Sequence, residues 1–258
     1  MLAVGLALGA CEPRARPATA PEPTPPDLHI PPFAKLPYQR FSREAAVQIA
    51  YREWRAFGQP VAYPRTELPY DREREEGLWQ RIGEYWWLGL PFDWREGAFT
   101  GIHDQNGRTF PAREDGNFAW SAAFIDYVMR MAGAGRRFPY SPAHSDYINA
   151  ARQRQPADIV VSAERPESYA PQRGDLICMW RGRRQIRFDD LPTDHFPGHC
   201  DIVVAQRPGT LDAIGGNVEN AVALRHVPVT ADGRLAGPAG VLDPDYPWFV
   251  VLRVAYER

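Results

Sequence analysis

The chain has 258 residues, of which 44% are hydrophobic and 12% aromatic, so it can bury a substantial core. Its formal net charge of −2 and pI near 6.3 supply no basic face to neutralise phosphates, and this excludes nucleic acid as an expected partner. A globular protein is therefore expected.

The chain begins with an apolar run, MLAVGLALGAC, that is shorter than the roughly 20 residues needed to cross a bilayer but has the length of a signal-peptide core. Leu8-Gly9-Ala10-Cys11 resembles the bacterial lipobox, whose cysteine is acylated and becomes the first mature residue. Because Glu12 follows instead of aspartate, the resemblance implies a lipid anchor at Cys11 in the outer membrane, on its periplasmic face. No Lys or Arg precedes the run, and the alternative is an apolar N-terminus with an incidental cysteine.

The domain organisation follows from composition. We expect residues 1–10 to be a lipoprotein signal peptide and residues 11–37, which are crowded with proline, to be an extended tether. Residues 38–258 contain no convincing second boundary and are expected to form a single domain.

Helical periodicity dominates the first half of that domain. SREAAVQIAYREWRAFG predicts a helix with Ser42 as N-cap and Gly58 as its end. Further helices are predicted over about 72–88, from after Asn117 to Met131, and from Ser141-Pro142 onward.

Beyond Gln155 the pattern changes to short apolar runs separated by Gly, Pro and Asp, which predict strands. The runs cover 175–180, 199–205, 211–216, 221–229 and 248–256. Helices followed by strands indicate an α+β domain whose N-terminal helices pack on a mostly antiparallel sheet.

One hydroxyl lies near the start of an otherwise apolar helix, in FAWSAAF. Ser121 is on the core-facing side of the first turn, where free N–H groups and the helix dipole stabilise developing negative charge. A nucleophile and its oxyanion both gain from that position. The alternative is a packing serine that bonds back to a carbonyl.

A base for such a nucleophile is available in GHCDIVVA. His199 and Asp201 face one side of this strand, and Cys200 faces the other. If the sheet packs on the Ser121 helix, His199 can accept the serine proton. Asn217 in IGGNV, or Asp201, would then fix the tautomer of the imidazole. A structural histidine is the alternative.

Several residues are candidates for binding substrate around this pair. Glu84 and Tyr85 are expected to line a cleft, with Trp120 beside the nucleophile and His195 near the entrance. His144, early in its helix, can approach the Ser121 end of the neighbouring helix, although a structural role is the favoured interpretation.

The cysteines and the acidic loop also have two interpretations. Cys178 and Cys200 lie in adjacent predicted strands, where a disulfide is one option and two buried small residues the favoured one. RFDDLPTDHFPGH gathers acids and histidines, but its Pro-Gly pair and spacing do not match a zinc site. We therefore expect no metal and no other cofactor.

The motifs together resemble a family. A nucleophile in W-x-A-A-F, then G-D-L, G-H-x-x-I-V and G-G-N, is similar in order to the papain-like cell-wall hydrolases of the NlpC and CHAP type. More narrowly, WSAAFIDYVMRMAG preceded by EYWWLG resembles the bacterial group called domain of unknown function 2272, from about Leu78 to the C-terminus. The resemblance implies a papain-like fold with Ser121, His199 and Asn217 as nucleophile, base and orienting residue. It also implies peptidoglycan or other cell-wall peptide as the partner.

Serine stands where papain-like enzymes have cysteine, and this changes the expected chemistry. A serine hydroxyl must lose its proton to the base as the new bond forms, and it depends on an accurate oxyanion site. The chain has no G-x-S-x-G elbow. The first hypothesis is a hydrolase of amide or ester bonds that uses Ser121. The second is a binding or scaffold module that retains the cleft without the chemistry.

Overall fold

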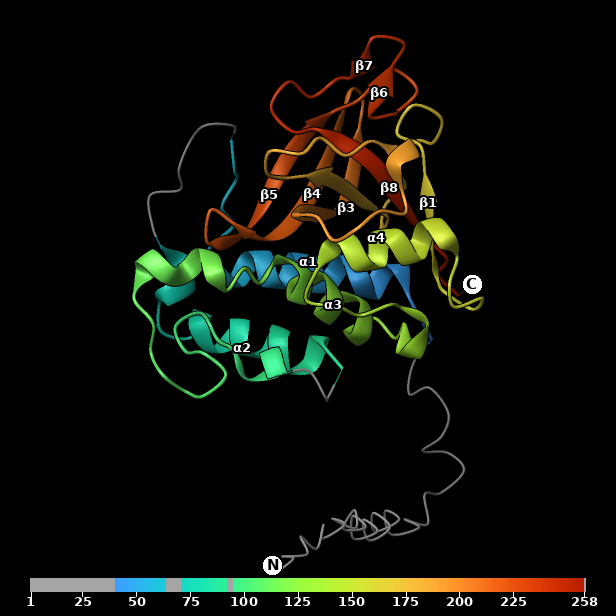
Figure 1. Ribbon diagram of the computed structural model, residues 1–258. Coiled ribbons are helices and arrows are strands. Elements are labelled where there is room, and N and C mark those ends of the chain that lie inside the picture. The colour runs from blue at the N-terminus through green and yellow to red at the C-terminus, as the bar shows by residue number, and fades with distance from the viewer. Residues whose placement is uncertain (1–39, 64–70, 92–94, 258) are drawn as a thin grey trace, which may run out of the picture. The chain divides into compact units, whose positions relative to one another are not determined.

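The computed structural model describes residues 40–63, 71–91 and 95–257 (Figure 1). The expectations for the signal peptide, for Cys11 and for the proline-rich tether fall outside these residues. Within them, no helix has both the length and the apolar character needed to cross a membrane.

Helices occupy the first part of the described chain and strands the second, as the sequence predicts. The α-helices are α1 (Arg43–Ala56), α2 (Leu78–Gly89), α3 (Ser121–Met131) and α4 (His144–Gln153). Short 3₁₀ turns cover Arg72–Arg74, Arg95–Ala98, Ala112–Asn117, Gly135–Arg137 and Phe188–Asp190. The strands are β1 (Val161–Glu164), β2 (Leu176–Trp180), β3 (Gly198–Arg207), β4 (Thr210–Val218), β5 (Ala221–Pro228), β6 (Ala236–Gly237), β7 (Gly240–Val241) and β8 (Trp248–Val254).

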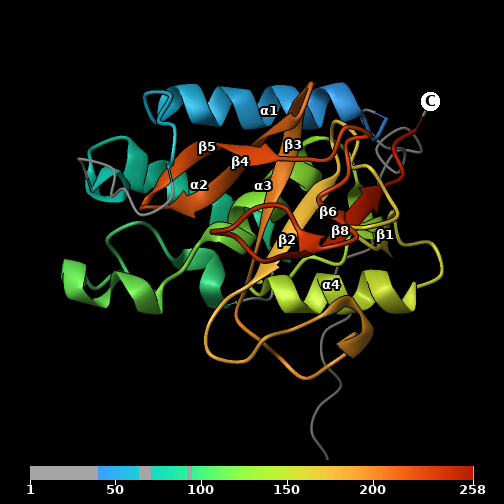
Figure 2. The same ribbon diagram turned by 90° about the horizontal axis from the view of Figure 1, so that it is seen from above.

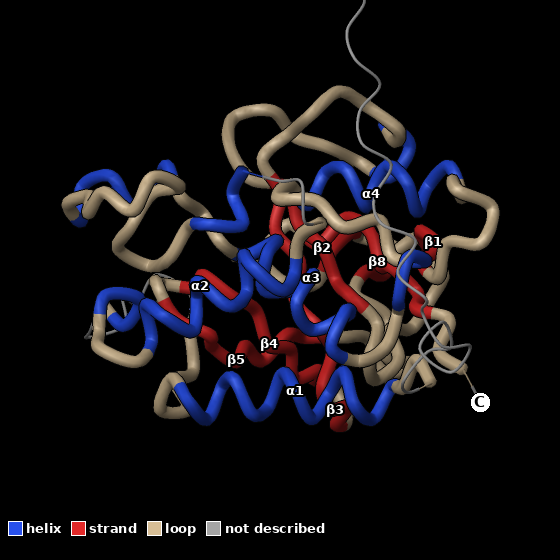
Figure 3. Tube along the Cα trace, turned by 90° about the horizontal axis from the view of Figure 1, so that it is seen from below, coloured by secondary structure: helices blue, strands red, loops and turns tan. Residues whose placement is uncertain are grey.

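The main sheet has six strands in the order β1-β8-β2-β3-β4-β5, and every neighbouring pair is antiparallel. The helices cover one face of the sheet, and the β6–β7 hairpin lies beyond the other (Figure 1). Seen from the helical side, α3 runs between α1 and α4 against the sheet (Figure 3). The same flanking positions of α1 and α4 are visible from the sheet side (Figure 2). The domain is therefore α+β with an antiparallel sheet.

The helix ends show which local signals determine them. Ser42 caps α1 by accepting a hydrogen bond of 3.2 Å from the Ala45 N–H, and Gly58 follows the helix with φ of +82°. Both were predicted. The α4 helix begins at His144, later than Ser141-Pro142, because the Ser141 hydroxyl accepts from the Ala143 N–H in a turn before the helix.

The sheet separates two clusters of buried side chains because its residues alternate between faces. On β3, Cys200, Ile202 and Val204 belong to the large cluster shared with the helices. Val203 belongs to a smaller cluster on the opposite face, with Ile177 and other apolar residues. The face to which each β3 residue points is therefore fixed by its position in this alternation.

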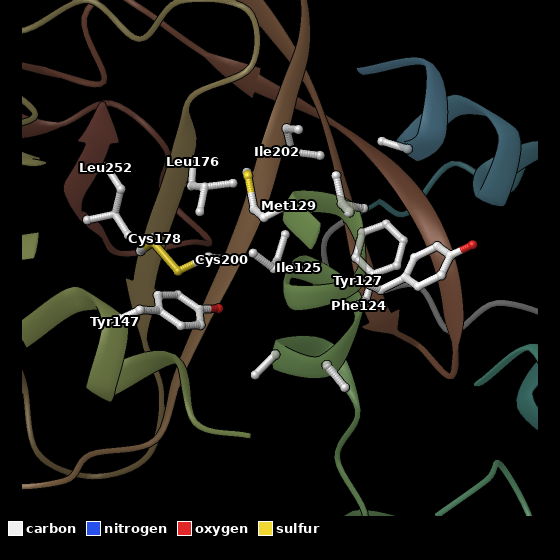
Figure 4. Close-up of a cluster of buried hydrophobic side chains, with 14 of the residues drawn as sticks. Phe124, Ile125, Tyr127, Met129, Tyr147, Leu176, Cys178, Cys200, Ile202 and Leu252 are labelled. Carbon is white, nitrogen blue, oxygen red and sulfur yellow. A yellow bond between two sulfur atoms is a disulfide. The ribbon is translucent and has the colours of Figure 1, made fainter. Parts of the chain in front are cut away.

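A disulfide joins Cys178 on β2 to Cys200 on β3, which corrects the favoured expectation of two unbonded cysteines. The two residues are directly opposite in the antiparallel register, with Cα atoms 4.1 Å apart. Both point into the cluster beside Ile125 and Met129 of α3 (Figure 4). The sequence placed them on adjacent strands but did not fix the register that makes them partners.

We predict that removing this bond destabilises the domain. The bond joins residues 22 positions apart in the sequence. Closing a loop of this size lowers the conformational entropy of the unfolded chain and so stabilises the folded state by about 3 kcal/mol. Urea unfolding of the Cys178→Ala/Cys200→Ala variant should show a loss of that order. Reductant should lower the stability of the wild type and leave the double variant unchanged; an unaffected wild type would contradict the prediction.

Candidate functional site

Ser121 is the first residue of α3, and its side chain is buried with 6% exposure. Trp120 precedes it as N-cap residue but supplies no side-chain cap. In the described part of the chain, the N–H groups of Ser121, Ala122 and Ala123 find no acceptor, since the first bond of the helix runs from the Phe124 N–H to the Trp120 carbonyl. A hydroxyl and a set of free donors thus meet at the positive end of the helix dipole.

The hydroxyl of Ser121 is hydrogen bonded to His144, the first residue of α4. The distance from Ser121 Oγ to His144 Nε2 is 2.7 Å. The other ring nitrogen, Nδ1, is hydrogen bonded to the Tyr147 hydroxyl one turn along the same helix. His144 and Tyr147 are both buried. Ser121, His144 and Tyr147 therefore form one continuous buried chain of hydrogen bonds.

His199 belongs to a second polar cluster that adjoins the first. Its Nε2 lies 2.7 Å from Asp201 Oδ1, and Asp201 Oδ2 accepts a hydrogen bond of 2.5 Å from Arg225 on β5. Asp201 is ionised and can only accept, so Nε2 carries the imidazole proton. Nδ1 keeps its lone pair, is buried, and has no hydrogen-bond partner among the described residues. The His144 and His199 ring centroids are 5.4 Å apart.

The expected hydrogen bond between Ser121 and His199 is not formed, and strand alternation explains why. Cys200 and Ile202 point to the helices, whereas His199 and Asp201 occupy the intervening positions and face the other side of the sheet. The predicted shared face of His199 and Asp201 is correct. The helix that carries Ser121 packs on the opposite face, and His144 takes the place beside the serine that we expected His199 to take.

Burial keeps both histidines neutral. It lowers the pKa of His144 well below its ordinary value, and the neighbouring His199 and Arg181 act in the same direction. Burial and the nearby Arg181 charge lower the pKa of His199 to about 4, against the opposing effect of Asp201. Although burial alone would raise it, the Arg225 guanidinium and the His199 hydrogen bond hold the pKa of Asp201 below its usual range. Near neutral pH both imidazoles are therefore unprotonated bases.

Two glycines of β4 leave room for this arrangement. A Cβ on Gly215 would overlap the Asp201 carboxylate and come 2.9 Å from His199 Nε2. A Cβ on Gly216 would run into Phe124 of α3. The glycine pair of the IGGNV motif thus serves close packing on both faces of the sheet.

The other predicted site residues are dispersed. Tyr85 is fully buried and donates to Glu53 at 2.7 Å, so it belongs to the core and does not line a cleft, while Glu84 is exposed on the same helix. His195 is exposed and its Nδ1 lies 3.1 Å from the Ser145 hydroxyl, next to His144. Asn217 is half-buried with φ of +52°. The partner that holds His199 is Asp201.

Trp120 is buried next to Ser121, and its indole N–H donates to Glu73 over 2.7 Å. The carboxylates of Asp71, Glu73 and Asp115 lie close together, with one oxygen of each within 4.8 Å of the others. Arg74 forms a salt bridge with Asp115, with 2.6 Å between Arg74 Nη1 and Asp115 Oδ1. Burial raises the pKa of Glu73 to about 8, so this carboxyl is largely protonated near neutral pH.

Sequence reasoning missed Tyr147 and Arg225. Tyr147 follows His144 by three residues, and this spacing places both on one face of a helix once the helix is recognised. Arg225 stands in the apolar run AVALRHVPV at a position that alternation buries, and a buried arginine needs a charged partner. Its partner, Asp201, was visible in the sequence, but the strand order that places β3 and β5 on either side of β4 was not.

The fold is that of an α+β domain with an antiparallel sheet and a polar cluster at the start of α3. The chain belongs to the family of domain of unknown function 2272, described as an uncharacterized protein conserved in bacteria, whose model matches residues 73–254. That range includes Ser121, His144 and Tyr147 of the first polar cluster and His199, Asp201 and Arg225 of the second. No curated protein and no solved structure was found to match the chain.

We predict that Gly215→Ala disrupts the His199–Asp201 cluster. The added methyl group must displace the Asp201 carboxylate, and we expect a loss of at least about 2 kcal/mol in the free energy of unfolding. Gly116→Ala is the matched control because a Cβ there has no neighbouring atom within 4 Å. Equal stability of the two variants in urea unfolding would refute the proposed steric requirement.

A pH dependence is predicted from Glu73. Its pKa rises from an ordinary 4.5 to about 8 on folding, so the folded state binds the extra proton between these values and loses stability as pH increases through them. From pH 6.5 to 8 this loss should amount to about 2 kcal/mol. The range from pH 6.5 to 8 lies above the pKa of both buried histidines, so their titration does not overlap with that of Glu73.

Glu73→Gln keeps a carbonyl acceptor for Trp120 and removes the titration. Urea unfolding of this variant should therefore be less sensitive to pH between 6.5 and 8 than that of the wild type. Parallel pH profiles of the two proteins would show that Glu73 does not carry the proton.

Proposed function

We propose that the protein is a hydrolase of amide or ester bonds in cell-wall peptide, with Ser121 as nucleophile and His144 as its general base. The observation that carries the proposal is the 2.7 Å hydrogen bond between Ser121 Oγ and His144 Nε2 at the beginning of α3. This distance is within the reach that proton transfer between nucleophile and base requires.

The position of the single ring proton of neutral His144 is compatible with this role. A neutral imidazole has one N–H, so the contacts of His144 with Ser121 and Tyr147 fit two tautomers. With the proton on Nδ1, His144 donates to the Tyr147 oxygen and Nε2 accepts from the serine hydroxyl. The proposal uses this tautomer. Tyr147 is then the positioning residue of the pair.

The reaction would follow the serine-hydrolase scheme. Ser121 Oγ bonds to the carbonyl carbon while its proton passes to His144 Nε2, and the carbonyl oxygen becomes an oxyanion. The free N–H groups at the start of α3 are the donors available to that oxyanion. His144 returns the proton to the leaving amine or alcohol as the acyl–serine bond remains. Water, deprotonated by His144, then releases the acid and restores the hydroxyl.

The Asp201 carboxylate, which is hydrogen bonded to the adjacent His199, supplies electrostatic support in this proposal. The His199 ring lies against His144, and the Asp201 carboxylate favours the protonated form of His144. An imidazolium formed during the reaction would thus have a negative charge nearby. Burial, His199 and Arg181 act against the protonated form and outweigh this effect, so the proposal requires the imidazolium only as a short-lived species of the reaction.

The choice of cell-wall peptide rests on the order of motifs shared with the papain-like NlpC and CHAP hydrolases. The lipobox-like N-terminus supports a placement on the periplasmic face of the outer membrane, where peptidoglycan is within reach. The cell-wall substrate, the outer-membrane location and the assignment of the domain to the papain-like group all belong to the proposal.

A second candidate function is supported by burial. Ser121 is 6% exposed, and His144 and His199 are 4% and 0% exposed. Substrate would have to open the structure to reach the hydroxyl. A cell-wall-binding or scaffold module, in which the Ser121–His144–Tyr147 chain only stabilises the packing of α3 on α4, accounts for the same contacts.

Digestion of purified peptidoglycan, with products identified by mass, separates these functions. Ser121→Ala should abolish product formation, and His144→Asn should lower the rate about 10²- to 10⁴-fold because the general base is lost. His199→Asn should cost much less. His226→Asn is the matched control and should digest normally, because His226 is an exposed histidine on β5 that pairs with Asp212 of β4 and contacts neither polar cluster of the site.

The outcomes distinguish three mechanisms. A larger loss for His199→Asn than for His144→Asn, with matched thermal stability, would make His199 the base. Equal rates for wild type and Ser121→Ala would remove Ser121 from the reaction. No digestion by the wild type, together with its sedimentation with peptidoglycan, would favour the binding module.

A further inference from the structure

A cavity of about 330 Å³ lies between the end of β2, the start of β8 and the β6–β7 hairpin. Residues 165–167 and the loop residues 185–189 complete its wall. Its volume is at the lower end of the range in which small-molecule sites are found. No residue of the two polar clusters lines it, so a ligand bound there would not depend on hydrolysis by Ser121.

The wall of the cavity is mostly apolar, and Trp180 is the aromatic side chain that it presents to a ligand. Trp248 and Phe249 also line the cavity but are buried, and two guanidinium groups lie over the Phe188 ring. Trp180 ends β2 and is only partly buried. Its indole therefore supplies an apolar surface on which a ligand can stack.

Three polar groups of the wall are free to bond to a ligand. The Trp180 indole N–H, the Gln185 carboxamide and the Arg187 guanidinium have no hydrogen-bond partner among the described residues. Gln185 and Arg187 are exposed, and the Trp180 N–H is not enclosed by the protein either. Together these side chains offer several donors and a carbonyl acceptor beside the apolar surface.

The charges of the wall balance one another. Its charged side chains are two acids and two arginines: Glu167, Asp189, Arg165 and Arg187. Arg165 pairs with both acids. Of the other charged residues on the loop, Asp190 accepts from the Arg187 backbone N–H, and neither Arg183 nor Arg184 lines the cavity. The wall therefore gives a charged ligand little net attraction, whereas a neutral ligand needs none.

We propose that this cavity binds a neutral disaccharide of β-linked pyranose sugars. The C–H groups on one face of such a sugar form an apolar surface, which would pack on the Trp180 indole. Hydroxyl groups around the ring would hydrogen bond to the Trp180 N–H and to the side chains of Gln185 and Arg187.

The two other classes of small ligand fit the wall less well. A wholly apolar ligand would leave the free polar groups of Trp180, Gln185 and Arg187 without partners, which costs affinity. An anionic ligand would approach the carboxylates of Glu167 and Asp189 as well as the arginines. A neutral ligand with an apolar face and a polar rim avoids both costs.

The test uses the full-length protein labelled with ¹⁵N, with cellobiose as the probe. The chain has eight tryptophans, so its indole N–H signals can be resolved, and the signal lost in Trp180→Leu identifies Trp180. We expect cellobiose to shift this signal in a saturable way, because the N–H gains an acceptor. The affinity should not change between about 0.05 and 0.5 M salt, because the ligand is uncharged.

Two variants reduce the contacts separately. Trp180→Leu should weaken binding at least about tenfold, because the stacking surface and one donor are lost. Gln185→Ala/Arg187→Ala should weaken it at least about fivefold. Both residues of this double variant are exposed, so its fold should persist even if Trp180→Leu is destabilised.

Three controls should bind cellobiose as the wild type does. Arg183→Ala changes an exposed arginine on the same loop but outside the wall. Trp87→Leu changes an exposed tryptophan on α2 that does not line the cavity. Ser121→Ala separates this site from the proposed hydrolysis, since a failure of either leaves the other intact.

Three results would overturn the proposal. One is the absence of any saturable shift at about 50 mM cellobiose. Another is a saturable shift of a different tryptophan signal while that of Trp180 stays in place, because the sugar would then bind elsewhere. The third is tighter binding of glucuronate that weakens with salt, since the cavity would then be an anion site.

Discussion

The alternation of side chains along β3 is the constraint on which the arrangement of the site depends. Because successive residues face opposite sides of a strand, Cys200 can close a disulfide under α3 only if His199 and Asp201 face away from it. The same period directs Asp201 toward Arg225 and leaves the place beside Ser121 to a residue from another element. His144 takes it because α3 and α4 begin next to each other. A single geometric rule thus assigns two neighbouring histidines to two different polar clusters.

The two clusters differ in what holds them. Ser121, His144 and Tyr147 are linked by hydrogen bonds between neutral groups at helix starts, whereas His199 is held by an ion pair that spans β3 and β5. An ion pair buried this deeply is costly to break, because removal of one partner leaves an uncompensated charge. The second cluster is therefore the rigid one, and His144 rests against it through the ring of His199.

Much of the fold could be predicted from the sequence. Apolar periodicity, the Ser42 cap and the Gly58 stop determine α1 locally, and short apolar runs located β2, β3, β4, β5 and β8. β1 and the β6–β7 hairpin were not predicted, because short strands carry little periodicity. At the site, Ser121 and the common face of His199 and Asp201 followed from local pattern. The partner of Ser121 did not, because it depends on which face of the sheet the helix covers and where α4 begins. Both are decided by tertiary packing.

The cross-strand disulfide has a consequence for how the protein can be made. The bond forms and persists where thiols are oxidised, and glutathione or thioredoxin in a bacterial or eukaryotic cytosol would keep Cys178 and Cys200 reduced. Protein that stays in such a cytosol would lack the covalent link between β2 and β3 beside His199. This reduced form would be the one most easily cleaved by proteases. Preparation by secretion, or by refolding with an oxidant, should therefore yield the fully closed molecule.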